Sequence, residues 1–365
     1  PMAETSGSLE RLLAKRARRT FLGRDAELDL LATHLLGGET LVVFVHGIPG
    51  VGKSTLLENF AERATGDGAR VLAMDCRMIE PTEQGFLGEL GRQTGDLVES
   101  LEDAVDALTR IDGPVVLAAD HYETFGLMDT WLRTRFLPAM PDTVRMVMAG
   151  RRPPVSQWRT APSWAGLVHE LPLEPLDREA GAALLAELGI DEESAGRLVA
   201  ATHGNPLALT LAASAARTHG AVAIRQNEIQ DVMQELAMLF LEDVEDGPTR
   251  EALQCAGVAR RITRSLLRAF SLDDRELFES LRALPFVDAR RDGLCLHDAV
   301  REAMAQTLKA SDPERFHACR CRAWRQLRDE SRSASRDDVW RYTADMLYLI
   351  SNPVVREAFF PSDHR

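Results

Sequence analysis

Short apolar runs alternate with amphipathic stretches over roughly the first half of the chain. Five runs of strand length stand at 41–46, 70–75, 114–120, 144–150 and 166–172. They are apolar almost throughout, as is typical of parallel strands that are covered on both sides. Because helical patterns separate the runs, residues 21–172 are predicted to form an α/β domain, a parallel sheet with helices on both faces.

The pattern turns helical after residue 172. Three amphipathic segments follow, and the first of them begins at Asp177, whose carboxylate can cap the start of a helix. We expect an all-α lid domain over 173–220 and a connecting helix over 221–246.

A third region covers 247–308. Helical patterns lead into "FVDARRDGLCLH", which predicts two short strands around a turn at Asp292-Gly293, and a last helix follows. Helices closed by a hairpin in this way predict a small winged-helix domain. Residues 1–20 are expected to form a helical arm, and 309–365 a helical extension. The helical extension ends in an apolar stretch that contains proline, and this end suggests that the natural chain continues into a sensor or effector domain.

Composition narrows the range of functions. The chain has 365 residues, 45% of them hydrophobic, and a net charge of −13. This acidity argues against DNA binding by this chain, because affinity for phosphate backbones comes largely from clustered cations. No apolar run approaches the roughly 20 residues of a membrane span, and no secretion signal is recognisable. We therefore expect a cytoplasmic protein without a membrane partner, with five reduced and inert cysteines.

The strongest motif is "GIPGVGKS", residues 47–54, between the first apolar run and a helix. In this GxxxxGKS pattern, glycines let backbone N–H groups cradle phosphates, and the helix start adds its dipole. Lys53 should reach the β- and γ-phosphates, the Ser54 hydroxyl should ligate Mg²⁺, and Thr55 should flank the α- or β-phosphate. The candidate phosphate-binding residues are Gly47, Gly50, Val51, Gly52, Lys53, Ser54 and Thr55.

A phosphate loop also needs an acid that holds Mg²⁺ through water, at the end of a neighbouring buried strand. Asp120 ends the run 114–120 and fits this role. Many hydrolytic P-loop enzymes place a second carboxylate beside it, but here the next residue is His121. Glu123 is either a substitute that orients the attacking water or a solvated acid at a helix start, and the sequence leaves both open. The pattern favours weak or conditional hydrolysis of the bound nucleotide over fast turnover.

Two arginines follow the run 144–150. A guanidinium at the end of this strand can contact the γ-phosphate and report its presence. We assign this role to Arg151, the first residue past the strand, and expect Arg152 to lie at the surface.

Three further short motifs are informative as a set: "FLGRDAEL" at 21–28, "HGNPLAL" at 203–209 and "LCLHDAVRE" at 294–302. With the phosphate loop, their order resembles the STAND family of signal-transduction ATPases, which includes the NB-ARC proteins, over about residues 20–308. The resemblance implies that Gly23 and Arg24 lie beside an adenine and that Pro206 packs against the base. It also implies that His297 contacts the β-phosphate of ADP and locks a closed form.

The function that this resemblance implies is a nucleotide-controlled switch with ATP or ADP and Mg²⁺ as cofactors. ADP would hold the closed form, and exchange for ATP would expose surfaces for self-assembly. The alternative is an AAA+ ATPase that binds or remodels DNA at origins. It requires a basic face, for which "RRITRSLLR" at 260–268 is a partial candidate. A metabolic kinase is disfavoured, because the sequence shows no group of residues that would bind the acceptor of the phosphate.

Overall fold

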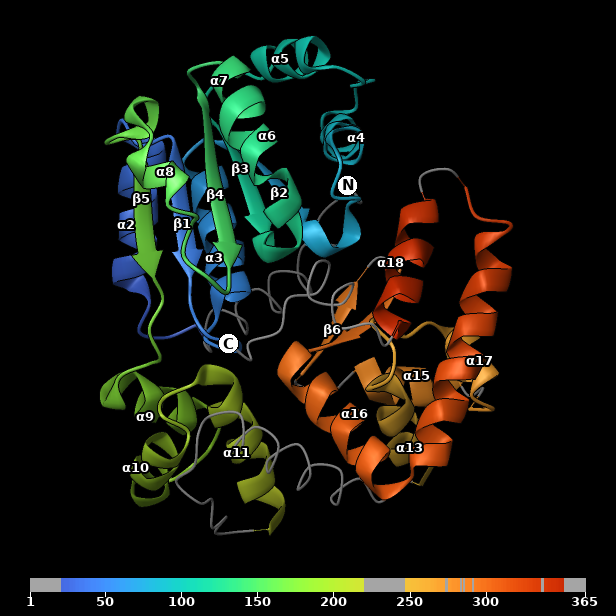
Figure 1. Cartoon of the computed structure of the whole chain (residues 1–365). Helices are drawn as coiled ribbons and strands as arrows, with labels where there is room; N and C mark the ends of the chain where they lie inside the picture. The colour runs from blue at the N-terminus through green and yellow to red at the C-terminus, as the bar shows by residue number, and fades with distance from the viewer. Residues whose placement is uncertain are drawn as a thin grey trace, which may run out of the picture. The chain divides into compact units, whose positions relative to one another are not determined.

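The structure is a computed structural model (Figure 1), which describes residues 21–219, 247–272, 275–282, 284, 286–290, 292–335 and 338–350. It divides after Glu174 into two compact units. The expected arm at 1–20, the connecting helix at 221–246 and the segment 351–365 lie outside the described residues. Over the part of the chain that is described, no helix combines the length and apolarity needed to cross a membrane.

The first unit is built on a parallel sheet of five strands. All neighbouring strands run parallel, in the order β2-β3-β4-β1-β5, which confirms the predicted parallel sheet. The strands are β1 (Val42–His46), β2 (Arg70–Asp75), β3 (Val115–Asp120), β4 (Val144–Gly150) and β5 (Val168–Pro172).

Helical segments cover both faces of this sheet. The longer helices are α2 (Asp25–Leu36), α3 (Lys53–Gly66), α4 (Glu83–Thr94) and α5 (Leu101–Thr109). Short helical turns fill the segment between β3 and β4: a 3-10 turn (Tyr122–Met128), α6 (Asp129–Trp131), a π turn (Leu132–Phe136) and α7 (Leu137–Ala139). Another short helix, α8 (Gln157–Thr160), follows β4.

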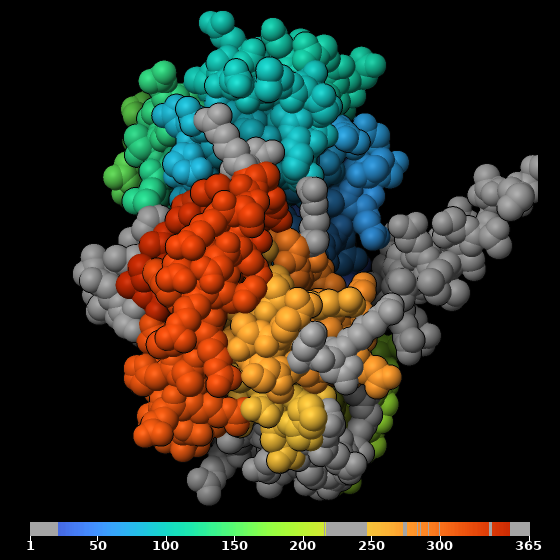
Figure 2. All heavy atoms as spheres, turned by 90° about the vertical axis from the view of Figure 1, so that its right-hand side faces the viewer, coloured from blue at the N-terminus to red at the C-terminus, as the bar shows by residue number. Residues whose placement is uncertain are grey.

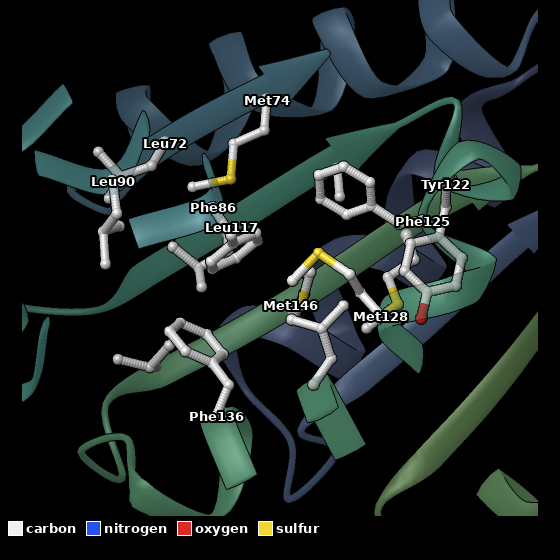
Figure 3. Close-up of a cluster of buried hydrophobic side chains, with 14 of the residues drawn as sticks. Leu72, Met74, Phe86, Leu90, Leu117, Tyr122, Phe125, Met128, Phe136 and Met146 are labelled. Atoms are coloured by element: carbon white, nitrogen blue, oxygen red, sulfur yellow. The ribbon is translucent and has the colours of Figure 1, made fainter. Parts of the chain in front are cut away.

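Two hydrophobic cores explain why the strands are apolar throughout. Alternate residues of β1 enter opposite cores, Val43 and Val45 on the side of α2 and α3, and Val42 and Phe44 on the other side. The second core joins the sheet to α4, α5 and the short turns after β3 (Figure 3). Since successive side chains of a strand point to opposite faces, a strand buried on both faces loses the alternation of polar and apolar residues.

The strand order corrects one expectation. Asp120 was expected on a strand next to β1, but β4 pairs with both β1 and β3 and lies between them. Sequential strands are often neighbours, and the apolar runs carry no signal that a later strand is inserted. The consequence is that β4 ends between the phosphate loop and Asp120.

The second unit begins with three helices, α9 (Arg178–Glu187), α10 (Glu192–Ala201) and α11 (Pro206–His219). The Asp177 Oδ1 atom accepts a hydrogen bond from the Ala180 N–H at 2.8 Å, which confirms the predicted cap. The turn before α11 requires a glycine, because a Cβ on Gly204 would lie 2.0 Å from the Leu176 carbonyl oxygen. Asn205 is fully buried, and its Oδ1 caps α11 by accepting from the Leu207 and Ala208 N–H groups.

The remainder of the second unit is helical around one hairpin. Its elements are α13 (Gly247–Ala256), α14 (Arg264–Ala269), α15 (Arg275–Arg282), β6 (Val287–Arg290), β7 (Gly293–Leu296), α16 (Asp298–Ser311), α17 (Pro313–Ser331) and α18 (Val339–Leu349). Helix α17 packs against α14, α16 and α18 on the surface that Figure 2 shows.

The hairpin is antiparallel, as expected, but its turn differs by one residue. Arg290 pairs with Gly293, so Asp292 lies in the turn and Gly293 already belongs to β7. Ile262, which precedes α14, forms a further antiparallel bridge with Leu294. The winged-helix assignment of 247–308 stays a prediction.

Candidate nucleotide-binding site

The phosphate loop connects β1 to α3, and its three glycines are needed for two different reasons. A Cβ on Gly47 would lie 2.4 Å from the Leu173 carbonyl oxygen, so no side chain fits there. Gly50 and Gly52 have φ of 77° and 100°, values that side-chain-bearing residues rarely adopt. Between them, Val51 is fully buried and anchors the loop in the core of the unit.

Lys53 is the first residue of α3, and its side chain folds back over the loop. The Nζ atom donates hydrogen bonds to the carbonyl oxygens of Gly47, at 2.7 Å, and Ile48, at 3.0 Å. The ammonium group therefore lies beside the loop backbone and the N-terminus of α3. A helix N-terminus with an adjacent cation is a site that favours phosphate.

Asp120 lies at the end of β3, and the structure brings it to Ser54. The Ser54 side chain is near enough to the Asp120 carboxylate to lower its pKa, and this carboxylate accepts a hydrogen bond of 2.8 Å from the His121 N–H. Burial alone would raise the pKa of Asp120. The charge of His121, its hydrogen bond, the Ser54 side chain and the charge of Arg77 outweigh burial and hold that pKa well below its usual range. Asp120 is therefore a carboxylate at neutral pH.

His121 is held among acidic groups, although its sequence position suggested only a missing acid. Its Nδ1 is 3.1 Å from Asp120 Oδ2 and 3.7 Å from Asp75 Oδ1, and Arg77 binds the Asp75 carboxylate through Nε and NH2. Burial and the Arg77 charge lower the pKa of His121, but the two carboxylates outweigh them and the pKa is raised. The two carboxylates thus favour the protonated form of the imidazole, which lies within ion-pairing distance of Asp120.

Glu123 is not a solvated acid, because only 11% of its side chain is exposed. Its Oε1 lies 3.3 Å from Arg151 Nε, whereas its Oε2 is buried without a hydrogen-bond partner among the described residues. Gly150 permits this approach, since a Cβ there would lie 3.1 Å from Oε2. The two candidate residues from the ends of β3 and β4 are therefore paired with each other.

A buried aspartate anchors the segment that carries His121 and Glu123. Asp129 Oδ1 accepts hydrogen bonds from the Tyr122 hydroxyl, at 2.8 Å, and from Trp158 Nε1, at 2.7 Å. Burial, together with the Asp129 charge, raises the pKa of Tyr122, so the phenol stays protonated. Sequence reasoning missed Asp129; its one signal was an acid inside the apolar stretch "FGLMDTW".

Arg24 also belongs to the surroundings of the loop. It is 6% exposed, and its NH2 group donates to the Val51 carbonyl oxygen, at 3.2 Å, and to the Glu174 carbonyl oxygen, at 2.5 Å. Its NH1 group binds Glu27 Oε1 at 2.7 Å, and Gly23 before it has a φ of 70°. In this structure the Arg24 guanidinium holds the backbone of the loop.

The remaining predicted ligands of the nucleotide lie in the second unit. Pro206 begins α11, and His297 precedes α16, where its N–H donates to the Phe286 carbonyl oxygen at 2.9 Å. Their predicted contacts with the base and with the β-phosphate stay predictions. Thr55 lies exposed in the first turn of α3.

The donor set suits Mg²⁺ bound together with a nucleotide. A hydroxyl and a carboxylate are hard oxygen ligands, and Mg²⁺ commonly takes only one or two protein ligands and completes its shell with phosphate and water. Among the described residues, no group of three or more His, Cys, Asp or Glu side chains is arranged to hold a metal ion. Any metal at Ser54 and Asp120 would therefore depend on the phosphates.

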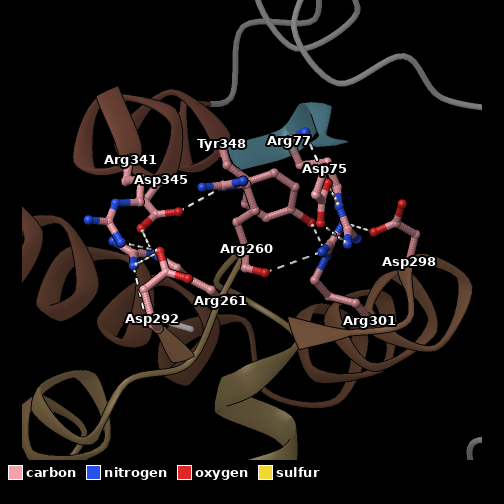
Figure 4. Close-up of polar contacts among 10 residues, drawn as sticks. All are labelled: Asp75, Arg77, Arg260, Arg261, Asp292, Asp298, Arg301, Arg341, Asp345 and Tyr348. Carbon is pink, nitrogen blue, oxygen red and sulfur yellow. Dashed lines mark hydrogen bonds and ion pairs between the residues drawn. The ribbon is translucent and has the colours of Figure 1, made fainter. Parts of the chain in front are cut away.

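The candidate DNA-binding segment is largely buried in the second unit. Arg260 and Arg261 are each 5% exposed and bind the Asp345 carboxylate, and Arg261 also donates to Asp292 at 2.7 Å (Figure 4). A third arginine, Arg264, is half exposed and lies 3.6 Å from Glu279. Two of the four arginines in 260–268 thus neutralise buried acids.

Comparisons with known proteins agree with the geometry of the first unit. Residues 20–90, which include α2, β1, the phosphate loop, α3 and β2, match the family of the AAA ATPase domain. A search of curated proteins gives no significant match.

Among solved structures, the chain is similar to a STAND protein with a tetratricopeptide repeat sensor from Pyrococcus horikoshii. The TM-score is 0.57 at 14% sequence identity, and the match covers 93% of this chain and 52% of that chain. The chain thus spans about half the length of the P. horikoshii protein. At this identity the likeness concerns the fold alone.

Two other similar structures have TM-scores below 0.5 and distinguish no function. The Walker-type ATPase of Pyrococcus abyssi has a TM-score of 0.46 and 15% identity, with 78% of this chain and 96% of that chain covered. The Orc1 protein of Aeropyrum pernix, solved in complex with DNA, has a TM-score of 0.41 and 18% identity, with 80% and 93% covered.

Three observations converge on the first unit: the strand order, the glycine loop with Lys53, and the family match. Residues 21–174 form an α/β domain with a phosphate loop, and its fold fits that of P-loop NTPases.

Proposed function

We propose that this protein is an ATP/ADP-dependent molecular switch of a bacterial signalling or regulatory system, with slow or conditional ATP hydrolysis. ADP holds the closed form, and exchange for ATP opens it and promotes self-assembly. Two things support the proposal: the candidate phosphate site in the first unit and the resemblance of the sequence to STAND ATPases.

One observation carries this proposal, the pairing of Glu123 with Arg151. The carboxylate that would orient the attacking water is 3.3 Å from the guanidinium that would contact the γ-phosphate. A site in this arrangement can bind nucleotide through the loop, Lys53 and Asp120. It hydrolyses ATP only after Glu123 has been released from Arg151, and this supports a switch better than a fast enzyme.

The roles of the remaining residues follow from their positions. Bound Mg²⁺ would supply positive charge at the β- and γ-phosphates. Ser54 and Asp120 would hold it, and Lys53 would leave the loop carbonyls for the phosphates. His121 lies 3.1 Å from Asp120 and occupies the position at which many hydrolytic P-loop enzymes have a second carboxylate. Arg24 holds the loop in shape beside the predicted adenine site, and Pro206 and His297 keep the roles that the family resemblance implies.

The alternative, an AAA+ ATPase that binds or remodels DNA, requires exposed cations in the second unit. The burial of Arg260 and Arg261 in ion pairs with Asp345 and Asp292 removes half of the candidate basic segment. The net charge of −13 also weighs against DNA binding. A DNA-binding titration at several salt concentrations tests this alternative, and steep salt dependence at submicromolar affinity would favour it.

The decisive experiment identifies the nucleotide that copurifies with the chain. The protein is denatured as purified, and the released nucleotide is separated by chromatography and compared with the protein concentration. We expect about one ADP per chain, and none from Lys53→Ala, while Lys309→Ala, which changes an exposed lysine at the end of α16, keeps its ADP. An empty wild-type site with rapid turnover of added Mg²⁺-ATP would overturn the switch proposal.

A further inference from the structure

Two cysteines from distant parts of the sequence meet inside the second unit. Cys255 in α13 and Cys319 in α17 are 64 positions apart, yet their Sγ atoms lie 3.0 Å from each other. They are 2% and 3% exposed. The five cysteines are all free in the structure, and Cys321, two residues after Cys319, is exposed. The sequence analysis expected all five cysteines to be reduced and inert, and it carried no signal that Cys255 and Cys319 meet.

The surroundings of the two thiols make the contact specific. Glu251 precedes Cys255 by four residues and Arg315 precedes Cys319 by four, so each pair lies on one face of its helix. Glu251 Oε1 and Arg315 NH2 form an ion pair of 2.5 Å. One turn of each helix thus aligns the ion pair, and the next turn aligns the two sulfurs.

The two thiols differ in acidity. The hydrogen bond shared with Cys319 and burial raise the pKa of Cys255. For Cys319, the same hydrogen bond lowers the pKa, burial opposes it, and the positive charges of Arg315 and Arg322 lower it further. Cys319 is therefore the group that forms a thiolate, and the thiolate is the form that reacts with oxidants.

We propose that Cys255 and Cys319 form a redox modification site, at which a peroxide converts the two adjacent thiols into a disulfide that joins α13 to α17. This site is separate from the proposed nucleotide chemistry. Its consequence is a covalent link between the first helix of the 247–308 region and the helical extension.

The reaction proceeds in two balanced steps. The Cys319 thiolate attacks one oxygen of hydrogen peroxide, the O–O bond breaks, and hydroxide leaves with a Cys319 sulfenic acid remaining. The Cys255 sulfur then attacks the Cys319 sulfur, the S–O bond breaks, and a second hydroxide leaves. With the two thiol protons, both hydroxides become water. The two sulfurs have lost two electrons, and one peroxide has gained them.

Because both sulfurs are already in contact, the second step requires little movement, and the sulfenic acid should not accumulate. Cys321 lacks this neighbour at its exposed position and should stop at oxidised monothiol products. A reductant such as dithiothreitol should restore both thiols of the disulfide. These differences separate an internal disulfide from general oxidation of the chain.

The test treats the full chain with hydrogen peroxide, quenches it with an alkylating agent and maps the products by mass spectrometry without reduction. We expect a peptide pair joined through Cys255 and Cys319 in the wild type and in Cys321→Ser. The pair should be absent from Cys255→Ser and Cys319→Ser. In Cys255→Ser, dimedone should trap the Cys319 sulfenic acid that the wild type does not accumulate.

The result on the wild type decides the proposal even where a cysteine variant folds poorly. Oxidation of the exposed Cys321 with Cys255 and Cys319 still alkylated as free thiols would overturn it. So would a disulfide between Cys319 and a different cysteine. A Cys255–Cys319 link that forms in the folded wild type, and that dithiothreitol reverses, supports it.

Discussion

Glu123 Oε1 and Arg151 Nε, from the ends of neighbouring strands β3 and β4, lie 3.3 Å apart beside the phosphate loop. Only 11% and 17% of these side chains are exposed. A partly desolvated pair is stronger than a surface pair, and removing one partner leaves the other charge poorly compensated. Two predictions test this pair, and two more test the stability of the second and the first unit.

The variant Glu123→Gln should keep nucleotide binding and lose most of the ATP hydrolysis that the wild type shows. A carboxylate that orients and accepts a proton from water typically contributes about 10²-fold or more to a rate, and an amide cannot accept that proton. Single-turnover hydrolysis of bound ATP measures the effect. A variant that hydrolyses at the wild-type rate would exclude Glu123 from catalysis.

The variant Arg151→Gln should reduce the preference of the site for ATP over ADP. We expect roughly a tenfold loss of ATP affinity with ADP affinity nearly unchanged, because only ATP presents a third phosphate to the guanidinium. Isothermal titration with both nucleotides measures the two affinities. Arg152→Gln, which changes the adjacent exposed arginine, is the matched control. Equal losses for ATP and ADP in Arg151→Gln would contradict a γ-phosphate contact.

The variant Gly204→Ala should destabilise the second unit strongly. The new Cβ would lie 2.0 Å from the Leu176 carbonyl oxygen at a φ of 71°, so backbone must move as well as adopt a strained conformation. We expect a loss of about 3 kcal/mol or more in urea denaturation. Gly189→Ala has a similar φ of 83° with nothing near the Cβ, and should cost only about 1 kcal/mol. Equal losses of stability in the two variants would mean that the positive φ, and not the close contact with Leu176, causes the destabilisation.

Protonation of His169 should lower the stability of the first unit. His34 and His169 stack with ring centroids 3.9 Å apart, and burial, assisted by the His34 ring, lowers the pKa of His169 against the opposing charge of Glu170. With the folded pKa below the unfolded value of 6.5, the unfolded chain takes up the proton first as pH falls. Neutral His169 therefore makes its full contribution to the stability of the first unit above about pH 6.5, and this contribution is lost as the pH falls through the pKa of the folded state.

The measurement compares denaturation midpoints at about pH 7.5 and about pH 5.5. His169→Phe preserves a stacked ring that cannot be protonated, so the decrease between the two pH values should become smaller. His317→Phe, at an exposed position of α17, should leave the decrease unchanged. An unaltered pH dependence in His169→Phe would show that other groups dominate it.

The local features of the fold could be predicted from the sequence, because they depend on short-range chemistry. The apolar runs, the Asp177 cap and the Gly50 and Gly52 conformations each follow from a few consecutive residues. The insertion of β4 between β1 and β3 could not, because the apolar runs look alike in the sequence and carry no signal of strand order.

The contacts of the charged residues could be predicted only in part, because several of them join residues that are distant in sequence. The motif indicated Ser54, and the end of an apolar run indicated Asp120; the Ser54 side chain lowers the pKa of Asp120 in the structure, and their joint role in binding Mg²⁺ stays a prediction. The burial of Glu123 and of Arg260 depends on partners that are distant in sequence, Arg151 and Asp345. A charged side chain looks solvated in a sequence until its partner is known.

Arg24 places one planar group between two backbone carbonyls, those of Val51 in the phosphate loop and Glu174 at the last residue of its unit. The conformation of the phosphate loop is therefore linked to the position of the backbone at Glu174, where the chain leaves the first unit. Both hydrogen bonds come from the same NH2 nitrogen, so a shift of the backbone at Glu174 can reach the phosphate loop through a single shared donor atom, without passing through the sheet. Arg24 in this sense couples the point where the chain leaves the first unit to the shape of the phosphate loop.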